Sequence, residues 1–514
     1  MQVVLTGIPL DANLSDVTKG TDQSAAIQAV LDTAVTSGPL ELIIPGVVKA
    51  KDLKLHSNTT LRGLGQGTGI VQAPGGTSAI RNYNWVSPYN NQQIVDANIC
   101  VRDLEINGNQ QNASANTLAG TAHWSTNNNY LKATNAGVLV CPIEFYGVSG
   151  LTIENVYVRD PAAYHIHVAN IDHGTFRDLR VNDSAHAAAP FNGPNTAGLQ
   201  INGPANDIEV DGLYGNTSDD FLALNAEDWN LVSGGDPSLL LGPQLFGGNW
   251  NSVYMGPIVR VTARNLNMNT SSGIRLCSQS QLIDQVSISS VKGSATLYGL
   301  ETNPSIPGYS AGNGNIGKVV LEDWDLPTLT DPGAIALVNV DAVITSLVLR
   351  NFRRGLMNSA ADSIVVGPSA SVGVLAVDGF AINELGTGSS ANLLRMQAGV
   401  VNLLAISGIR WARGVSSTAS VGVFNQTGGG INSLRLSDII ADRVTWIVVV
   451  TGGNVPEITT SGLKHTNSGG NASIVATGAT IPRLRCSGSD TRLLTATGTG
   501  GAITSKKTDG TEDA

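Results

Sequence analysis

A six-residue pattern of apolar residues returns along most of the chain and constrains its fold more than any other feature. It consists of an apolar residue, any residue, a second apolar residue, any two residues and a third apolar residue. The clearest copies end at Leu104, Val156, Leu213, Val291, Trp324, Phe352, Phe380, Ile409 and Ile439. Because alternate residues of a strand point to the same face, the first two apolar positions share one face, and the following pair bends the chain.

The spacing of the later copies predicts a stack of coils. From Phe352 through Phe380, Ile409 and Ile439 to Leu463 the steps are 28, 29, 30 and 24 residues. Each step is long enough for three short strands and their turns. An antiparallel sandwich also alternates, but it does not repeat one motif at a near-constant phase. We therefore predict an all-β parallel β-helix, a solenoid whose coils bury their core against one another.

Two steps in the first half of the chain are longer. Leu104 and Val156 are 52 residues apart, and Leu213 and Leu266 are 53 residues apart. We expect two coils in each of these steps, which gives roughly a dozen coils in the whole solenoid.

Composition agrees with this fold and excludes several classes of protein. The 514 residues include 59 glycines, and 42% are hydrophobic but only 14% charged, which favours short strands and many turns over a helix bundle. A net charge of -10 argues against nucleic acid or anionic membrane as a partner. No segment approaches the roughly 18 apolar residues of a membrane span, so we expect a soluble chain.

The cysteines give no sign of a metal or disulfide framework. Cys100, Cys141, Cys277 and Cys486 are far apart and lack CxxC spacing, so we expect free thiols, no metal and no cofactor. The first residues also lack the basic run and long apolar stretch of a secretory signal.

The first seventy residues differ from the rest. Thr21 or Asp22 is expected to cap an amphipathic helix that covers the open end of the solenoid, whose first coil otherwise exposes unpaired backbone. An apolar strand, Pro45-Gly46 and the segment 58–65 follow. This order resembles the N-terminal segment of pectate-lyase-like proteins and of bacteriophage tailspikes. The resemblance implies a right-handed parallel β-helix.

These features predict four regions. Residues 1–70 form the cap helix and first coil, 71–310 the β-helix with a catalytic groove, 311–504 the later coils with an oligomer contact, and 505–514 a disordered tail. The last region is polar and lacks the periodicity of the coils.

An acidic pair lies within the repeating region, in the segment Ser218 to Leu224. If Leu222 points into the core, Asp219 faces outward on the same strand and Asp220 lies at the turn. Two carboxylates this close cannot both ionise freely at neutral pH, so one serves as acid while its neighbour serves as base. The alternative is an Asp-rich turn that satisfies its own backbone groups.

Three segments resemble the polygalacturonase family of glycosidases in order and spacing: residues 195–201, 218–224 and 273–276. That family uses one aspartate of the first motif and two of the second for inverting hydrolysis, and a basic pair of the third to hold the sugar. The resemblance implies that Asp219 and Asp220 are catalytic and that Arg275 binds substrate. Ala197 stands at the first aspartate and Cys277 at the lysine, and no Gly-His-Gly follows the acidic pair.

Other side chains are candidates for the same site. Because Ala197 offers no carboxylate, we expect an additional catalytic acid from Glu227, Asp228 or Glu301, each of which is alternatively a solvated surface group. Inverting glycosidases need carboxyls about 6.5 to 9.5 Å apart and retaining ones about 5 to 5.5 Å. Arg275 binds a sugar or forms a surface salt bridge.

Further candidates bind substrate. His165 and His167 share one strand face and are candidates to bind substrate or, together with His123, His173 or His186, a metal ion. They are alternatively polar surface or stacked core. Trp229, Trp250 and Tyr254 occupy a long excursion without the repeat, and their rings either stack on sugars or pack the excursion itself.

Together these observations predict a glycan-cleaving enzyme that acts by hydrolysis, with lyase elimination as an alternative. The competing interpretations are a non-catalytic carbohydrate-binding fibre or adhesin and a structural phage tail component. The resemblance to tailspikes implies a virion tail, with a secreted enzyme as the second choice. It also implies a homotrimer, for which Trp411 and Trp446 of the later coils offer a contact surface.

Overall fold

The structure, a computed structural model, is built almost wholly from parallel strands. It describes residues 1–85, 93–109, 141–161, 164–184, 196–226, 256–303, 314–329, 336–354, 361–384, 391–413, 420–466, 472–488, 495–508 and 511–513. The predicted right-handed parallel β-helix is confirmed. Described residues up to Asp284 form one compact unit and those from Gln285 onward form a second.

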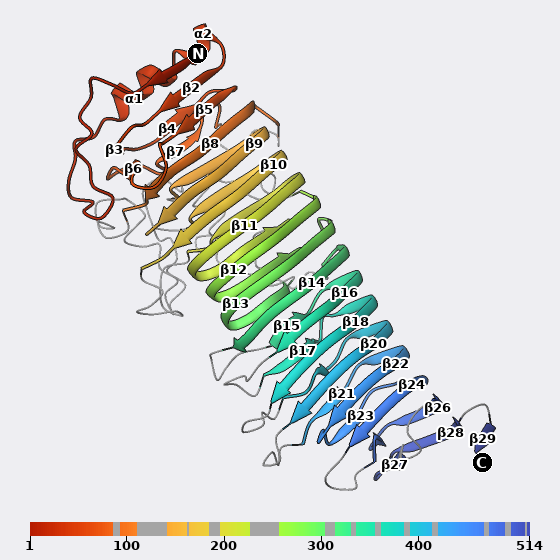
Figure 1. Cartoon of the computed structure of the whole chain (residues 1–514). Helices are drawn as coiled ribbons and strands as arrows, with labels where there is room; N and C mark the ends of the chain where they lie inside the picture. Colours follow the sequence, from red (N-terminus) through yellow and green to blue (C-terminus); the bar gives the residue numbers. More distant parts are fainter. Residues whose placement is uncertain are drawn as a thin grey trace, which may run out of the picture. The chain divides into compact units, whose positions relative to one another are not determined.

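Among the described residues, the helices and the longest strand, β11, lie in the first unit (Figure 1). Its elements are β1 (Gln2–Val4), α1 (Ser24–Leu31), α2 (Ala34–Ser37), β2 (Leu40–Ile43), β3 (Val47–Ala50), β4 (Leu53–Leu55), β5 (Thr59–Arg62), β6 (Gly69–Gln72), β7 (Ile80–Asn82), β8 (Asp96–Asn107), β9 (Ile143–Arg159), β10 (Ile166–Asn182), β11 (Leu199–Asn225) and β12 (Ile258–Cys277). The next strand, β13 (Ile283–Asn303), begins in this unit and lies mostly in the second.

All elements among the described residues of the second unit are strands. They are β14 (Ile316–Leu329), β15 (Ala336–Val340), β16 (Val343–Arg354), β17 (Asp362–Val366), β18 (Ser371–Glu384), β19 (Leu394–Met396), β20 (Val400–Arg413), β21 (Gly422–Gln426), β22 (Gly430–Asp442), β23 (Trp446–Val450), β24 (Glu457–Thr466), β25 (Ile474–Ala476), β26 (Thr480–Ser487), β27 (Thr495–Thr497), β28 (Ala502–Thr508) and β29 (Thr511–Asp513).

The predicted cap helix is present at the start of the first unit. Helix α1 packs against β2 and β4 and buries Ile27 and Leu31 completely. The Gln28 side chain binds the edge of β4 twice: its amide donates to the Lys54 carbonyl at 3.1 Å and its oxygen accepts from the Lys54 N–H at 2.8 Å. The helix therefore satisfies backbone groups that an uncovered first coil would leave unpaired.

The start of α1 differs slightly from the prediction. The N-cap residue is Gln23 rather than Thr21 or Asp22, and its side chain forms no capping hydrogen bond. The Asp22 carboxylate instead accepts a hydrogen bond from the Ser24 N–H at 2.9 Å, so it still satisfies one donor of the first turn.

The apolar motif stacks in register, as predicted. In the first unit Leu179 pairs with Leu213, and Leu213 pairs with Leu266. In the second unit Ile439 pairs with Ile409 on one side and with Leu463 on the other. Equivalent apolar positions of successive coils thus lie directly above one another.

The two long steps are single coils, so the expectation of two coils in each was wrong. Leu104 pairs directly with Val156, and Leu213 with Leu266. Neighbours in a parallel ladder belong to adjacent coils, which leaves no place for another coil between them. The repeat identifies one corner of each coil. It does not indicate how many residues lie between that corner and the same corner of the next coil.

A left-handed backbone turn precedes the third apolar residue of the motif. Asp103 and Asn155 have φ of 55° and 50°, and Asp323 and Asn351 have φ of 57° and 53°. In both cases the asparagine amide donates to the aspartate of the previous coil, at 2.8 Å and 3.0 Å. Asn, Asp and Gly tolerate this conformation, whereas other residues lose about 1 to 2 kcal/mol in it.

Three aromatic rings continue the stack at the third apolar position of the second unit. The Trp324 and Phe352 ring centroids are 5.1 Å apart, and those of Phe352 and Phe380 are 5.3 Å apart, with interplanar angles of 18° and 20°. All three side chains are at most 1% exposed. Phe352 therefore contacts rings on both sides within a closed core.

The structure differs from two expectations for the later part of the chain. Trp411 is only 2% exposed, so it does not offer a contact surface for a trimer, whereas Trp446 is partly exposed. Strand β28 pairs in parallel with β26 and antiparallel with β29, so residues expected in a tail from Ser505 begin within a strand.

The four cysteines are free thiols, as predicted. Within the part of the chain described, no helix has the length and apolar character to cross a membrane.

We predict that Phe352→Ala destabilises the second unit by about 3 to 5 kcal/mol, because it removes a buried ring between two others and leaves a cavity. Thermal denaturation followed by circular dichroism measures the effect. The neighbouring Arg353, whose side chain is 74% exposed, provides the control: Arg353→Ala should change stability by less than about 0.5 kcal/mol. Equal effects of the two changes would contradict the stacked core.

The left-handed backbone turn at Asn351 leads to a separate prediction. Asn351→Val should destabilise the protein by at least about 1 to 2 kcal/mol, because a β-branched residue is strained at φ of 53°. Asn351→Gly keeps the conformation accessible and should cost clearly less, even though both variants lose the hydrogen bond to Asp323. Chemical denaturation of the two variants compares them, and a more stable valine variant would refute the left-handed turn.

Candidate functional site

A row of polar residues crosses the first unit on strands β7, β9, β10 and β11. Arg81, Glu144, His167 and Gln200 occupy equivalent positions of successive coils. Glu144, His167 and Gln200 have buried apolar sequence neighbours on both sides, so strand alternation points these polar side chains away from the core. Glu144, His167 and Gln200 are nevertheless at most 2% exposed. We call these four residues the polar row.

Hydrogen bonds fix the histidine of the polar row. The Tyr146 hydroxyl lies 2.8 Å from His167 Nδ1, and His167 Nε2 lies 3.1 Å from Asn202 Oδ1. An amide oxygen only accepts, so Nε2 carries the proton and Nδ1 accepts from the Tyr146 hydroxyl. The Gln200 amide donates to the same Asn202 oxygen at 3.1 Å.

Burial sets the charge of the polar row. It lowers the pKa of His167 to about 4, against a smaller opposing effect of the hydrogen bond to Asn202. Burial also raises the pKa of Glu144 well above its usual value, although the charge of Arg81 opposes this shift. His167 is therefore neutral at neutral pH, and burial favours the protonated form of Glu144.

His165 is likewise enclosed. It is fully buried, its Nδ1 lies 3.0 Å from the Ala197 carbonyl oxygen, and burial lowers its pKa. Neither His165 nor His167, both expected to bind substrate, has a solvent-exposed ring in this structure.

The predicted acidic pair and its arginine do come together, on β11 and β12. Arg275 Nε lies 3.1 Å from Asp220 Oδ2, and the two side chains are 18% and 4% exposed. Asp219 is partly exposed, and its carbonyl oxygen accepts from the Thr217 and Thr270 hydroxyls at 2.9 Å and 2.6 Å. The backbone of the pair is thus held from two coils, with one carboxyl enclosed beside a guanidinium and one nearer to solvent.

A third carboxylate in this region was not predicted from the sequence. Asp183 is 1% exposed and accepts hydrogen bonds from the Thr196 hydroxyl at 2.7 Å and from the Ser218 hydroxyl. The Ser218 N–H in turn donates to the Thr196 hydroxyl at 3.0 Å. Asp183 therefore ties together the residues that immediately precede Ala197 and Asp219. The sequence signal was weak, because Asp183 lies outside both motifs and only the stacking of coils brings it to them.

Of the remaining candidates, Glu301 alone belongs to the described residues. Glu227, Asp228, Trp229, Trp250 and Tyr254 lie outside the described residues. Glu301 lies in the second unit, where it is 6% exposed and accepts from the Asn339 amide at 3.3 Å.

Comparison with known proteins supports the fold. The sequence matches no protein-family model, and a search of curated proteins finds no match.

Among solved structures, the tailspike protein of E. coli bacteriophage HK620 in complex with a pentasaccharide is 11% identical, with a TM-score of 0.50 over 90% of this chain and 77% of that one. The family 28 exopolygalacturonase of Yersinia enterocolitica is 12% identical over 96% and 76% of the chains, with a TM-score of 0.41. An exopolygalacturonase from Thermotoga maritima is 10% identical over 90% and 93%, with a TM-score of 0.35. The likeness to the tailspike confirms, at the level of the fold, the right-handed parallel β-helix that the N-terminal segment predicted.

Proposed function

We propose that the protein hydrolyses a polysaccharide and that Asp219 and Asp220 carry the reaction with the help of Arg275. The observation that supports this most is the buried Asp220–Arg275 ion pair next to a carboxyl that is partly open to solvent. Glycosidases need one carboxylic acid that is protonated and one carboxylate that is ionised. Two adjacent aspartates, of which one is enclosed beside a guanidinium and the other is partly open to solvent, provide such a difference.

The environment of each carboxyl suggests its role. A guanidinium 3.1 Å from Asp220 stabilises the ionised carboxylate. A negative charge on Asp220 then favours the protonated form of its neighbour Asp219. In the proposed mechanism Asp219 donates a proton to the glycosidic oxygen as general acid, and Asp220 is the ionised partner that assists the attacking water.

Asp183 has a supporting part in this proposal. It holds the Ser218 and Thr196 hydroxyls, and Ser218 directly precedes the proposed acid. We treat Asp183 as a positioning residue, since it is buried and acts on Asp219 through the chain.

The substrate class follows from charge and from the fold. A chain of net charge -10 repels polyanions, which favours a neutral or mixed-charge glycan. The tailspike with the same fold holds a pentasaccharide in its solved structure. Lyase elimination remains the alternative chemistry, and a fibre that binds glycan without cleaving it remains the alternative function.

Location and assembly are part of the same proposal. The likeness of fold to a phage tailspike supports a virion tail or another extracellular location. A homotrimer is the assembly that we propose for such a tail protein, and sedimentation at micromolar concentration distinguishes it from a monomer.

The catalytic proposal predicts the effect of single substitutions. Asp219→Asn and Asp220→Asn, made separately, should each lower the rate of glycan cleavage by about a hundredfold to ten-thousandfold, because each removes a group that transfers a proton. New reducing ends measure the rate, and glycan binding should persist. The control is Asp438→Asn, since Asp438 is an exposed aspartate of the second unit and asparagine tolerates its φ of 50°. Wild-type rates in both site variants would exclude the acidic pair as the catalytic group.

The ion pair predicts a pattern of stability. Arg275→Met should destabilise the first unit by about 3 to 5 kcal/mol, because it removes the positive charge beside a buried carboxylate. The double change Asp220→Leu with Arg275→Met should recover most of that loss, since a buried ion pair adds little over an apolar pair of similar volume. Denaturation curves of the single and double variants test this, and additive losses would show that the two charges do not interact.

A further inference from the structure

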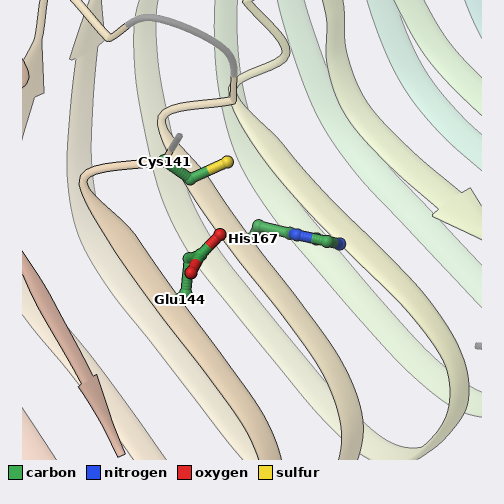
Figure 2. Close-up of side chains that lie close together, drawn as sticks. All are labelled: Cys141, Glu144 and His167. Atoms are coloured by element: carbon green, nitrogen blue, oxygen red, sulfur yellow. The ribbon is translucent and has the colours of Figure 1, made fainter. Parts of the chain in front are cut away.

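A thiol, a carboxyl and an imidazole meet at the polar row, on two adjacent coils. Cys141 lies just before β9, Glu144 lies on β9, and His167 lies on β10 in register with Glu144. One potential ligand atom from each residue lies within 4.8 Å of the others (Figure 2). All three side chains are at most 1% exposed. Ligand atoms bound to one tetrahedral zinc ion are roughly 3.5 Å apart, so small side-chain shifts suffice to close this arrangement.

The carboxyl of this cluster has an unused oxygen. Glu144 Oε2 has no hydrogen-bond partner among the described residues, although the side chain is fully buried. Its other oxygen, Oε1, lies 3.3 Å from the Tyr146 hydroxyl. A buried carboxyl oxygen without a partner loses its hydration and gains no hydrogen bond in return, which is unfavourable. A bound cation would provide Oε2 with its missing interaction.

The histidine is oriented for coordination. Its Nε2–H is held by Asn202 Oδ1 at 3.1 Å, which directs the lone pair of Nδ1 toward the side of Tyr146 and Glu144. Histidine ligands of metal sites typically donate their second ring N–H to an oxygen in this way. If a metal occupied Nδ1, the Tyr146 hydroxyl could donate instead to Glu144 Oε1, which it already approaches. The displaced hydrogen bond would thus be replaced by one that orients a metal-bound carboxylate.

We propose that Cys141, Glu144 and His167 bind one divalent transition-metal ion, with zinc as the best match. A thiolate, an imidazole and a carboxylate are the ligand types that zinc takes, and a zinc ion would balance the charges of a thiolate and a carboxylate in this buried place. Three protein ligands leave a fourth position for water or another ligand. The ion would join adjacent coils of the first unit, and this role is independent of glycan hydrolysis.

A second cluster provides a control. Ligand atoms of Asp172, His173 and Asp207 also lie within 4.8 Å of one another. The His173 side chain is 66% exposed, however, and Asp207 already forms an ion pair with Arg260 at 2.6 Å. These groups are open to solvent, and Asp207 already has an arginine partner, so they do not need a metal ion.

Zinc and cobalt binding to the full chain test the proposal. After chelator treatment and dialysis, the wild-type protein should bind one Zn²⁺ per chain and unfold at a higher temperature with the ion than without it. Bound Co²⁺ should show the intense visible bands of a tetrahedral site and a thiolate charge-transfer band. This measurement uses the wild-type protein and therefore does not depend on whether a variant folds. Co²⁺ bound without either spectral signature would overturn the assignment. The absence of stoichiometric metal binding would also overturn it.

Variants locate the ion. Cys141→Ser and Glu144→Gln should each weaken Zn²⁺ binding by at least about a hundredfold, and Tyr146→Phe by about ten- to a hundredfold, as expected for a group that orients a ligand. His173→Ala should leave affinity unchanged. Far-UV circular dichroism of each metal-free variant checks that it is folded. Unchanged affinity in folded Cys141→Ser and Glu144→Gln, or loss of binding in His173→Ala, would place the ion elsewhere.

Discussion

The in-register pairing of parallel strands is the constraint on which the rest of the structure depends. Backbone N–H and C=O groups of each strand bond to the strand at the same place in the next coil, so equivalent side chains stack on one another. The stack of Leu179, Leu213 and Leu266 in the first unit and the stacked rings of Trp324 and Phe352 in the second follow from this. The left-handed turn before the third apolar residue is repeated for the same reason.

The same constraint creates the polar sites. When outward positions carry polar residues in successive coils, register places them next to one another regardless of their distance along the chain. Glu144, His167 and Gln200 become neighbours in this way, and so do Asp220 and Arg275, which are 55 residues apart. Because several of these outward groups are also buried, each must find its partner among the neighbouring side chains. Water cannot stabilise a buried charge that lacks a partner.

The sequence predicted the fold well because the fold is periodic. The six-residue motif indicates the strand by its alternating apolar positions. It also indicates the turn, because small or polar residues such as Gly408 or Asp438 precede its third apolar position. The number of coils in the long steps was missed, because Leu104 and Val156 are consecutive rungs and the repeat does not report the length of an excursion. The burial of Trp411 was missed because its position lies outside the motif and has no predicted direction.

The candidate site was predicted only in part. Asp219, Asp220 and Arg275 stand within motifs, and the pairing of Asp220 with Arg275 follows from their adjacent coils. Asp183 and the cluster of Cys141, Glu144 and His167 carry no recognisable spacing, since their proximity arises between coils. Such contacts become visible only when the register of each coil is known.

Cleavage of a susceptible surface polysaccharide in water enriched in oxygen-18 tests the central claim most directly. Hydrolysis at the site of Asp219 and Asp220 breaks the glycosidic bond with one water molecule, so mass spectrometry should find one heavy oxygen in each newly formed product pair. An unsaturated product without the label would contradict hydrolysis and indicate elimination. Binding of the polysaccharide with no product at all would contradict catalysis and indicate a carbohydrate-binding fibre.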